Sequence, residues 1–314
     1  MNASIDIEVS EVGPRDGLQS ITPIMATKDK KLWISALAAA GLPEIEVGSF
    51  VPKSVLPQLA DTAELVEHAL TIGGLTIAVL VPNLRGAEGA IKARAHKISI
   101  PLSVSETHSL KNVRRSHVQM LQEVRSIRAL INDQPEHLRP KFEGSLSTAF
   151  GCTLEGKLPE TLVFSLAEAL MEAGCDEVGL SDTTGFGTPK QVKSLTLGVW
   201  NAVGKENLNG IHLHNTRGQG FANVMSALEV GLTTIDSSMA GIGGCPFAPG
   251  ASGNIVTEDL IFLLEGQGLK TGVNFERLLK ARNILRDSLP AEVELYGFTT
   301  DAGLPKDFEM ATPQ

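Results

Sequence analysis

The chain has 314 residues, of which 42% are hydrophobic and 20% are charged, and its formal net charge at pH 7 is -9. Its three cysteines, Cys152, Cys175 and Cys245, are widely spaced, which argues against a disulfide framework or a thiolate zinc site. Lysine and arginine are scattered, and no apolar run reaches the roughly 18 to 20 residues that span a bilayer. Because the first ten residues carry two acids and no base, we expect a cytoplasmic protein without nucleic-acid or membrane partners.

Short runs rich in valine, isoleucine and leucine recur along the chain. Their lengths are those of ordinary β-strands, and segments of helical length separate them. The eight predicted strands are residues 5–12, 44–50, 75–81, 98–104, 145–150, 177–180, 211–214 and 234–239.

Between these runs, apolar residues recur at the spacing of one helix face. Residues 120–131 predict a helix that ends before a proline, and residues 162–170 predict another that Gly174 is placed to end. Thr188 followed by Pro189 has the pattern of an N-cap and first helical residue.

Strands that alternate with helices indicate βαβ units and a parallel sheet. Eight such units favour a closed (β/α)8 TIM barrel, with an open doubly wound sheet as the alternative. No Gly-x-Gly-x-x-Gly motif follows the first run, which removes the usual dinucleotide-binding reason to prefer the open sheet. We expect one catalytic domain over residues 1–314, in which residues 275–314 form a short C-terminal helical extension packed on the barrel.

The seventh predicted strand carries His212 and His214, two of only seven histidines. Residues two apart on a strand face the same side, about 6 to 7 Å apart at Cα, so both imidazoles can reach one ion. Asp16, at the end of the first strand, would complete a nitrogen and oxygen donor set suited to Mg or Mn. The alternative is that one histidine caps the strand and the other is an interior side chain.

Arg15 precedes Asp16, and a guanidinium at a barrel mouth can face a developing oxyanion with two parallel donors. Glu46 on the second strand could hold that guanidinium. The alternatives are a surface ion pair between Arg15 and Asp16 and a purely structural salt bridge to Glu46.

Three further residues lie at the ends of predicted strands or in loops. Asp182 follows the sixth strand, where it either belongs to a site or forms a turn before the next helix. Residues 241–254 contain five glycines, which suits a lid or a close approach of backbone to a ligand. Within this loop Cys245 is either a reactive thiol or an inert one, and Asn254 alone has the pattern of a helix cap.

At these residues the sequence resembles the 3-hydroxy-3-methylglutaryl-CoA lyase family, over about residues 5–265. The most specific stretch is Gly-Ile-Gly-Gly-Cys-Pro-Phe-Ala-Pro-Gly-Ala-Ser-Gly-Asn at residues 241–254. Supporting motifs are Glu-Val-Gly-Pro-Arg-Asp-Gly-Leu-Gln at residues 11–19 and His-Leu-His-Asn-Thr-Arg-Gly-Gln at residues 212–219.

The resemblance implies a role for each candidate residue. Arg15 would stabilise the enolate oxygen of the acyl-CoA product, and Cys245 would take part in proton transfer. Glu46 would orient Arg15, and Asp182 would support the site. A divalent cation, Mg or Mn, would be held by Asp16, His212, His214 and Asn254.

The implied reaction is cleavage of 3-hydroxy-3-methylglutaryl-CoA, or a close 3-hydroxyacyl-CoA, by a metal-dependent carbon–carbon lyase. The alternatives are a citramalyl-CoA-type lyase, a Claisen-type acyl-CoA synthase and a silent barrel that senses acyl-CoA or metal. The sequence departs from the family pattern at Thr153, Leu154, Asn215 and Arg217, where an altered acyl or CoA pocket is expected. The expected partner is an acyl-CoA thioester, and a homodimer is left open.

Overall fold

The computed structural model describes residues 5–243, 253–298 and 304–313. Its eight strands close into a barrel in which each strand lies parallel to the next and the eighth pairs with the first, so the predicted (β/α)8 TIM barrel is confirmed. The strands are β1 (Glu8–Glu11), β2 (Glu44–Ser49), β3 (Thr76–Leu80), β4 (Lys97–Ser103), β5 (Lys141–Ser147), β6 (Glu177–Ser181), β7 (Gly210–His212) and β8 (Thr234–Ser237).

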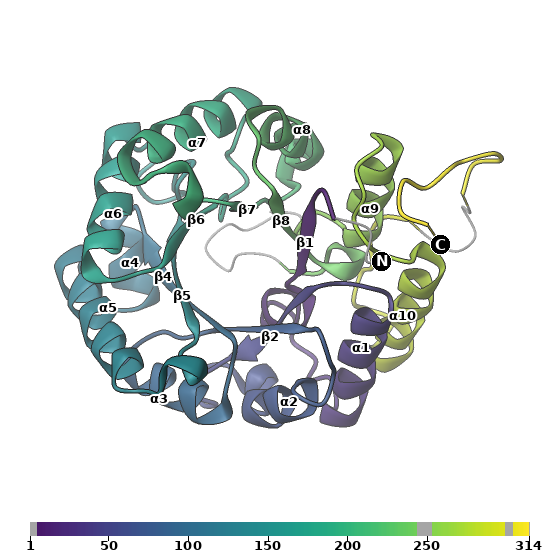
Figure 1. Ribbon diagram of the computed structural model, residues 1–314, viewed down its shortest axis with the longest axis horizontal. Coiled ribbons are helices and arrows are strands. Elements are labelled where there is room, and N and C mark those ends of the chain that lie inside the picture. The colour runs from purple at the N-terminus through teal and green to yellow at the C-terminus, as the bar shows by residue number, and fades with distance from the viewer. Residues whose placement is uncertain (1–4, 244–252, 299–303, 314) are drawn as a thin grey trace.

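Helices surround the barrel on its outer side, as Figure 1 shows. They are α1 (Thr27–Ala39), α2 (Thr62–Ala69), α3 (Leu84–Ala93), α4 (Glu106–Asn112), α5 (His117–Asn132), α6 (Glu160–Ala173), α7 (Pro189–Val203), α8 (Gly220–Val230), α9 (Thr257–Gly266) and α10 (Phe275–Ser288). Within the described ranges, none of them is long and apolar enough to cross a membrane.

The helices predicted from apolar spacing form where the local signals place them. A capping box between Ser116 and Gln119 starts α5, and Thr188 accepts a hydrogen bond from the Gln191 N–H at the start of α7. Gly174 ends α6 with a φ of 113°, a left-handed conformation that favours glycine.

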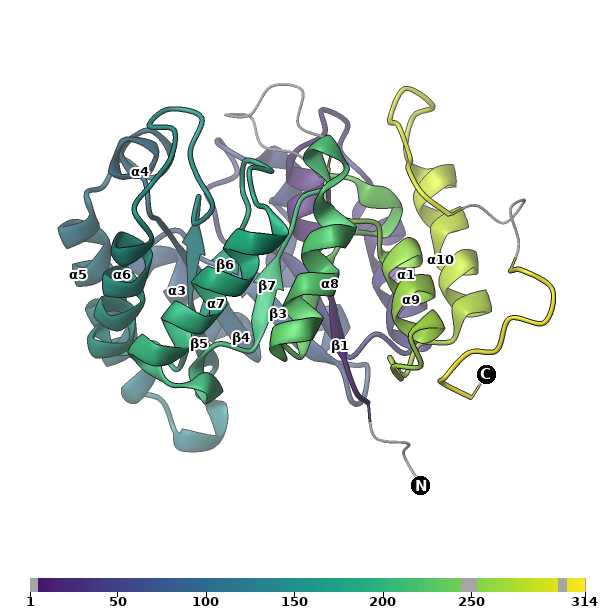
Figure 2. The ribbon, with the colours of Figure 1, turned by 90° about the horizontal axis from the view of Figure 1, so that it is seen from above.

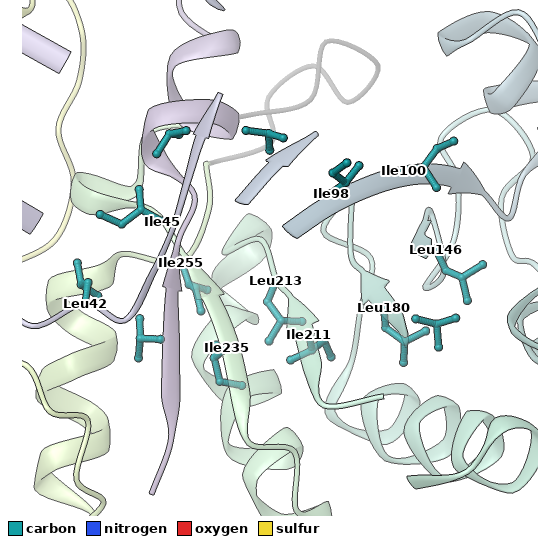
Figure 3. Packing of buried hydrophobic residues seen from close by; sticks show 14 of the residues in the cluster. Leu42, Ile45, Ile98, Ile100, Leu146, Leu180, Ile211, Leu213, Ile235 and Ile255 are labelled. Atoms are coloured by element: carbon teal, nitrogen blue, oxygen red, sulfur yellow. The ribbon is translucent and has the colours of Figure 1, made fainter. Parts of the chain in front are cut away.

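The apolar core lies between the outer face of the sheet and the helices. Alternate strand residues point outward, and Figure 3 shows Ile45, Ile98, Leu146, Leu180 and Ile235 in this layer. All five side chains are fully buried, so hydrophobic burial fixes the ring of helices around the barrel.

The inner face of the barrel is polar instead of apolar. Near the amino ends of the strands, the Lys97 ammonium lies 2.7 Å from Glu143, 3.1 Å from Glu177 and 3.6 Å from Glu44. We call these four residues the basal layer. Burial alone would lower the pKa of Lys97, but the three carboxylates outweigh it and hold that pKa well above its usual value.

This polar interior corrects the predicted fifth strand. The sequence predicts it at residues 145–150, whereas β5 is Lys141–Ser147. Lys141 and Glu143 lie on the inner face, where Lys141 reaches Glu177 and Glu143 reaches Lys97. A search for apolar runs misses the start of this strand because two of its first three residues are charged.

The C-terminal part packs against the outside of the barrel beside α1 and α9, as Figures 1 and 2 show. The N–H of Asn274, which caps α10, donates to the carbonyl of Ala40 at the end of α1. Further along, the Phe308 ring stacks on Phe262 of α9 with centroids 4.6 Å apart. These contacts attach the residues after α9 to the first and last helices of the ring.

One fully buried carboxylate connects β1 to the turn after β8. Glu11 accepts hydrogen bonds from the backbone N–H groups of Gly13 and Met239 and from the Thr257 hydroxyl. Burial raises its pKa to about 8, because these donors and its neighbours do not replace the lost hydration of a charged group.

Candidate active site

A cavity of about 770 Å³ opens at the carboxyl ends of the strands and reaches into the barrel. Its inner part is lined by polar side chains of the strands and by the turn after β1. Its outer part combines apolar residues with a basic rim. The apolar residues include Val51, Pro52, Val55, Leu56 and Val113, and the rim residues are Lys111, Arg114 and Arg115.

A single π-helical turn, Gly13–Gly17, follows β1 and presents two adjacent charged residues to the cavity. The Val12 carbonyl accepts hydrogen bonds from the N–H groups of Arg15 and Asp16. At Gly17 a Cβ would lie 2.6 Å from the Ile242 side chain, so close packing against the loop after β8 requires a glycine there. The turn therefore holds both charged side chains in place through backbone bonds and tight packing.

Asp16, His212 and His214 form a compact donor set. The two Nε2 atoms lie 3.2 Å apart, and each is 3.9 Å from Asp16 Oδ2. One ligand atom from each residue lies within 4.8 Å of the others. His212 ends β7, and His214 lies two residues beyond it on the same inner face, as the spacing predicts.

Asn254 joins this donor set from the far end of the loop after β8. A backbone bridge pairs it with His214, and its amide nitrogen donates to Asp16 Oδ2 at 2.7 Å. It does not cap α9, whose N-cap is Val256. Its Oδ1 is buried and has no hydrogen-bond partner within the described part of the chain.

These residues fit a divalent cation. Two imidazole nitrogens, a carboxylate oxygen and an amide oxygen are ligands that Mg and Mn accept, and an unpartnered buried oxygen is costly unless something binds it. Arg15 and Gln19 donate to one oxygen of Asp16, Oδ1, while the other, Oδ2, accepts from the Asn254 amide nitrogen and lies 3.9 Å from both histidine Nε2 atoms.

Arg15 is held between two carboxylates. Its Nε donates to Glu46 Oε2 and its Nη1 to Asp16 Oδ1, each at 2.5 Å. Burial would lower the pKa of Arg15, but Glu46 and Asp16 outweigh it and raise the pKa above its usual value. The side chain is 13% exposed, so this is not a solvated surface pair but a fixed cation at the cavity wall.

Asp182 lies in the turn after β6. Its carboxylate accepts hydrogen bonds from the N–H groups of Phe186 and Gly187, at 2.9 and 3.0 Å. Burial raises its pKa, and His214 is the largest opposing influence. The neighbouring Ser181 and Thr183 line the cavity, whereas Asp182 is bonded to its own loop.

The remaining candidate residues are Cys245 and the four positions that depart from the family pattern. Cys245 lies outside the described residues. Thr153, Leu154, Asn215 and Arg217 do not line the cavity in the described structure, so it gives no support to an altered pocket at these positions.

Two interior residues were not singled out from the sequence. Asp236 on β8 lies within hydrogen-bond distance of His212, and Lys97 centres the basal layer. For Asp236 the available signal was a charged residue inside the predicted strand 234–239. Lys97 gave no such signal, because it lies just before the predicted strand 98–104, whereas β4 begins with it.

The barrel and its donor set define a (β/α)8 protein with a candidate divalent-cation site at the carboxyl ends of its strands. The family model HMGL-like matches residues 6–285. The chain belongs to this family.

Individual relatives agree with that assignment. The chain is 41% identical over 283 residues to mitochondrial hydroxymethylglutaryl-CoA lyase of Macaca fascicularis, covering 90% of this chain and 86% of that protein. It is 38% identical to hydroxymethylglutaryl-CoA lyase YngG of Bacillus subtilis, covering 90% and 93%. An HMG-CoA lyase from Acinetobacter baumannii, solved with coenzyme A and 3-methylmalate, matches with a TM-score of 0.89 and 37% identity, covering 98% and 99%.

Proposed function

We propose that the chain cleaves 3-hydroxy-3-methylglutaryl-CoA to acetyl-CoA and acetoacetate, as a carbon–carbon lyase of the HMGL-like family. The observation that carries this proposal is the pairing of Arg15 and Asp16 on one turn. It sets a clamped guanidinium beside a nitrogen and oxygen donor set on the wall of one cavity.

The cation of this proposal is Mg or Mn, held by Asp16, His212, His214 and Asn254. When bound, it supplies Lewis acidity that acidifies and orients the substrate's 3-hydroxyl. The orphaned Asn254 Oδ1 supports its place in the ligand set.

The remaining chemistry belongs to the side chains. A base removes the hydroxyl proton, the bond between C2 and C3 breaks, and its electron pair passes into the thioester as an enolate. The C3 oxygen becomes the ketone of acetoacetate, and a proton delivered to C2 completes acetyl-CoA. Arg15 faces negative charge that develops only as the bond breaks, so it lowers the barrier more than it tightens binding.

The proposal gives three further residues supporting roles. Glu46 keeps the guanidinium of Arg15 oriented through the 2.5 Å hydrogen bond. Asp182 orders the turn after β6 beside the cavity residues Ser181 and Thr183. Cys245 takes part in proton transfer, a role that rests on the motif at residues 241–254. Replacing Cys245 with Ala should abolish most turnover, whereas replacing the buried Cys175 should not.

The shape and charge of the cavity suit a CoA thioester. The apolar outer wall matches the pantetheine arm, and Lys111, Arg114 and Arg115 at the rim match the phosphates.

We further propose one catalytic domain with a cytoplasmic location, no nucleic-acid or membrane partner, and assembly as a homodimer. Cell fractionation and analytical ultracentrifugation test the location and the assembly.

A related 3-hydroxyacyl-CoA, such as a citramalyl-CoA, is the second candidate substrate. It is kept as an alternative because the Acinetobacter relative, which covers nearly the whole chain, was solved with coenzyme A and 3-methylmalate, a hydroxy diacid isomeric with citramalate. The deciding experiment is a panel of 3-hydroxyacyl-CoA thioesters, assayed for acetyl-CoA release with Mg, with Mn and after chelation. Fastest release from the 3-hydroxy-3-methylglutaryl thioester supports the first substrate, and release from none contradicts both.

A further inference from the structure

His212 uses its two ring nitrogens in opposite directions. Its Nε2 faces His214 and Asp16 Oδ2, which are the other members of the donor set. Its Nδ1 lies 3.2 Å from Asp236 Oδ2. The β-sheet register sets up this second contact, because β7 and β8 pair His212 directly with Asp236.

A neutral imidazole that offers the Nε2 lone pair to a cation must carry its proton on Nδ1. That proton needs an acceptor, and in the described structure Asp236 is the group that meets it. The Asp236 carboxylate lies on the Nδ1 side of the ring and is not part of the donor cluster itself.

The second histidine provides an internal contrast. His214 Nδ1 is buried and has no hydrogen-bond partner among the described residues. Its backbone is held by the bridge to Asn254, and its ring contacts the other donors through Nε2 alone. Of these two imidazoles, only His212, which ends the three-residue strand β7, has a carboxylate at its Nδ1 in the described structure.

We infer that Asp236 is a positioning residue that fixes the tautomer and ring orientation of His212 for cation binding. This inference rests on the proposed divalent-cation site. A carboxylate behind a ligating imidazole restricts its rotation and increases its basicity, and loss of such a partner costs about 10- to 100-fold in metal affinity.

The first test measures Mn(II) affinity of the chelator-treated full chain by titration calorimetry and by electron paramagnetic resonance of free Mn(II). We expect Asp236→Asn to weaken binding about 10- to 100-fold, because its amide can donate to Nδ1 and favour the wrong tautomer. The thermal unfolding midpoint of the cation-free protein should stay close to that of the wild type.

The matched control is Glu44→Gln. Glu44 is an acid that faces the same cavity, but its partners are Ser10 and Lys97. If only interior charge attracted the cation, both variants would weaken binding equally, and that result would overturn the positioning role. Wild-type affinity in Asp236→Asn would overturn it too.

A second measurement needs no substitution at Asp236. In cation-free protein labelled with ¹⁵N-histidine, long-range proton–nitrogen spectra report which ring nitrogen of His212 carries the proton, with His212→Ala supplying the assignment. We expect Nδ1, and a proton on Nε2 would contradict the inference. If the wild type binds neither Mn(II) nor Mg(II), the proposed cation site itself fails, which is a result distinct from loss of binding in the variant alone.

Discussion

Two charged layers lie inside the same barrel, and they differ in whether the buried polar atoms without a hydrogen bond face an opposite charge. In the basal layer, Lys97 lies near three carboxylates, and Glu177 Oε1, which has no hydrogen-bond partner in the described structure, is 3.1 Å from its ammonium. In the layer around Asp16, both Asn254 Oδ1 and His214 Nδ1 are buried without a hydrogen-bond partner in the described structure.

The difference separates a structural role from a binding role. A buried charge that its neighbours neutralise can be maintained without a ligand, whereas an orphaned buried acceptor points to something that binds there. Charge alone does not distinguish the layers, because both contain acids and a cation. We therefore expect disruption of the basal layer to affect folding and disruption of the other layer to affect turnover.

The largest expected effect follows from removing the basal cation. Lys97→Met leaves Glu44, Glu143 and Glu177 facing one another without it, which should lower the free energy of unfolding by about 3 to 5 kcal/mol. Urea denaturation measures this loss. Lys193→Met, which breaks an exposed pair with Glu229, should cost less than about 1 kcal/mol. Equal losses in the two variants would show that Lys97 contributes no more to folding than an exposed lysine does.

Replacing Arg15 tests whether the layer around Asp16 supports turnover. Arg15→Met should lower kcat about 10²- to 10³-fold, as loss of an oxyanion-stabilising donor does. KM and Mn(II) affinity should change little, because the donor atoms of Asp16, His212 and His214 remain. Steady-state kinetics with the preferred thioester measures the effect. Normal turnover would remove Arg15 from the proposed mechanism.

A smaller effect concerns the pH dependence of folding stability. The pKa of Glu11 is raised to about 8 in the folded protein, so its folded form retains a proton that the unfolded chain has already lost. The resulting stabilisation is complete below the unfolded pKa and is lost as pH rises through about 8. Between pH 6 and pH 8 the loss should be about 2 kcal/mol.

Glu11→Gln tests this assignment because the amide imitates the protonated acid at every pH. Its unfolding free energy should fall less between pH 6 and pH 8 than that of the wild type. Parallel urea curves at several pH values measure the difference. An identical pH dependence in both proteins would mean that Glu11 is not the titrating group.

Much of the fold could be predicted because apolar strands and capped helices are local signals. The Thr188–Pro189 start of α7 and the Gly174 end of α6 are examples. The start of β5 could not be predicted, because Lys141 and Glu143 pair with residues on other strands. One segment of sequence carries no sign of such pairing.

The candidate site shows the same division. The spacing of His212 and His214 and the position of Asp16 predict the donor set, and the structure brings them together. Asp236 was missed because its meaning depends on the register between β7 and β8. For Asn254, the helix-cap pattern competes with its actual contact with Asp16, which comes from 238 residues away along the chain.

The turn Gly13–Gly17 also has a consequence for how such an enzyme can diversify. Arg15 and Asp16 are neighbours along the backbone, so one short segment fixes the spacing between the guanidinium and the cation donor set. The rim residues Lys111 and Arg114 come from a separate segment, the last turn of α4 and the residues after it. Mutation of that segment can therefore remodel the rim of the cavity while the spacing between Arg15 and Asp16 stays unchanged.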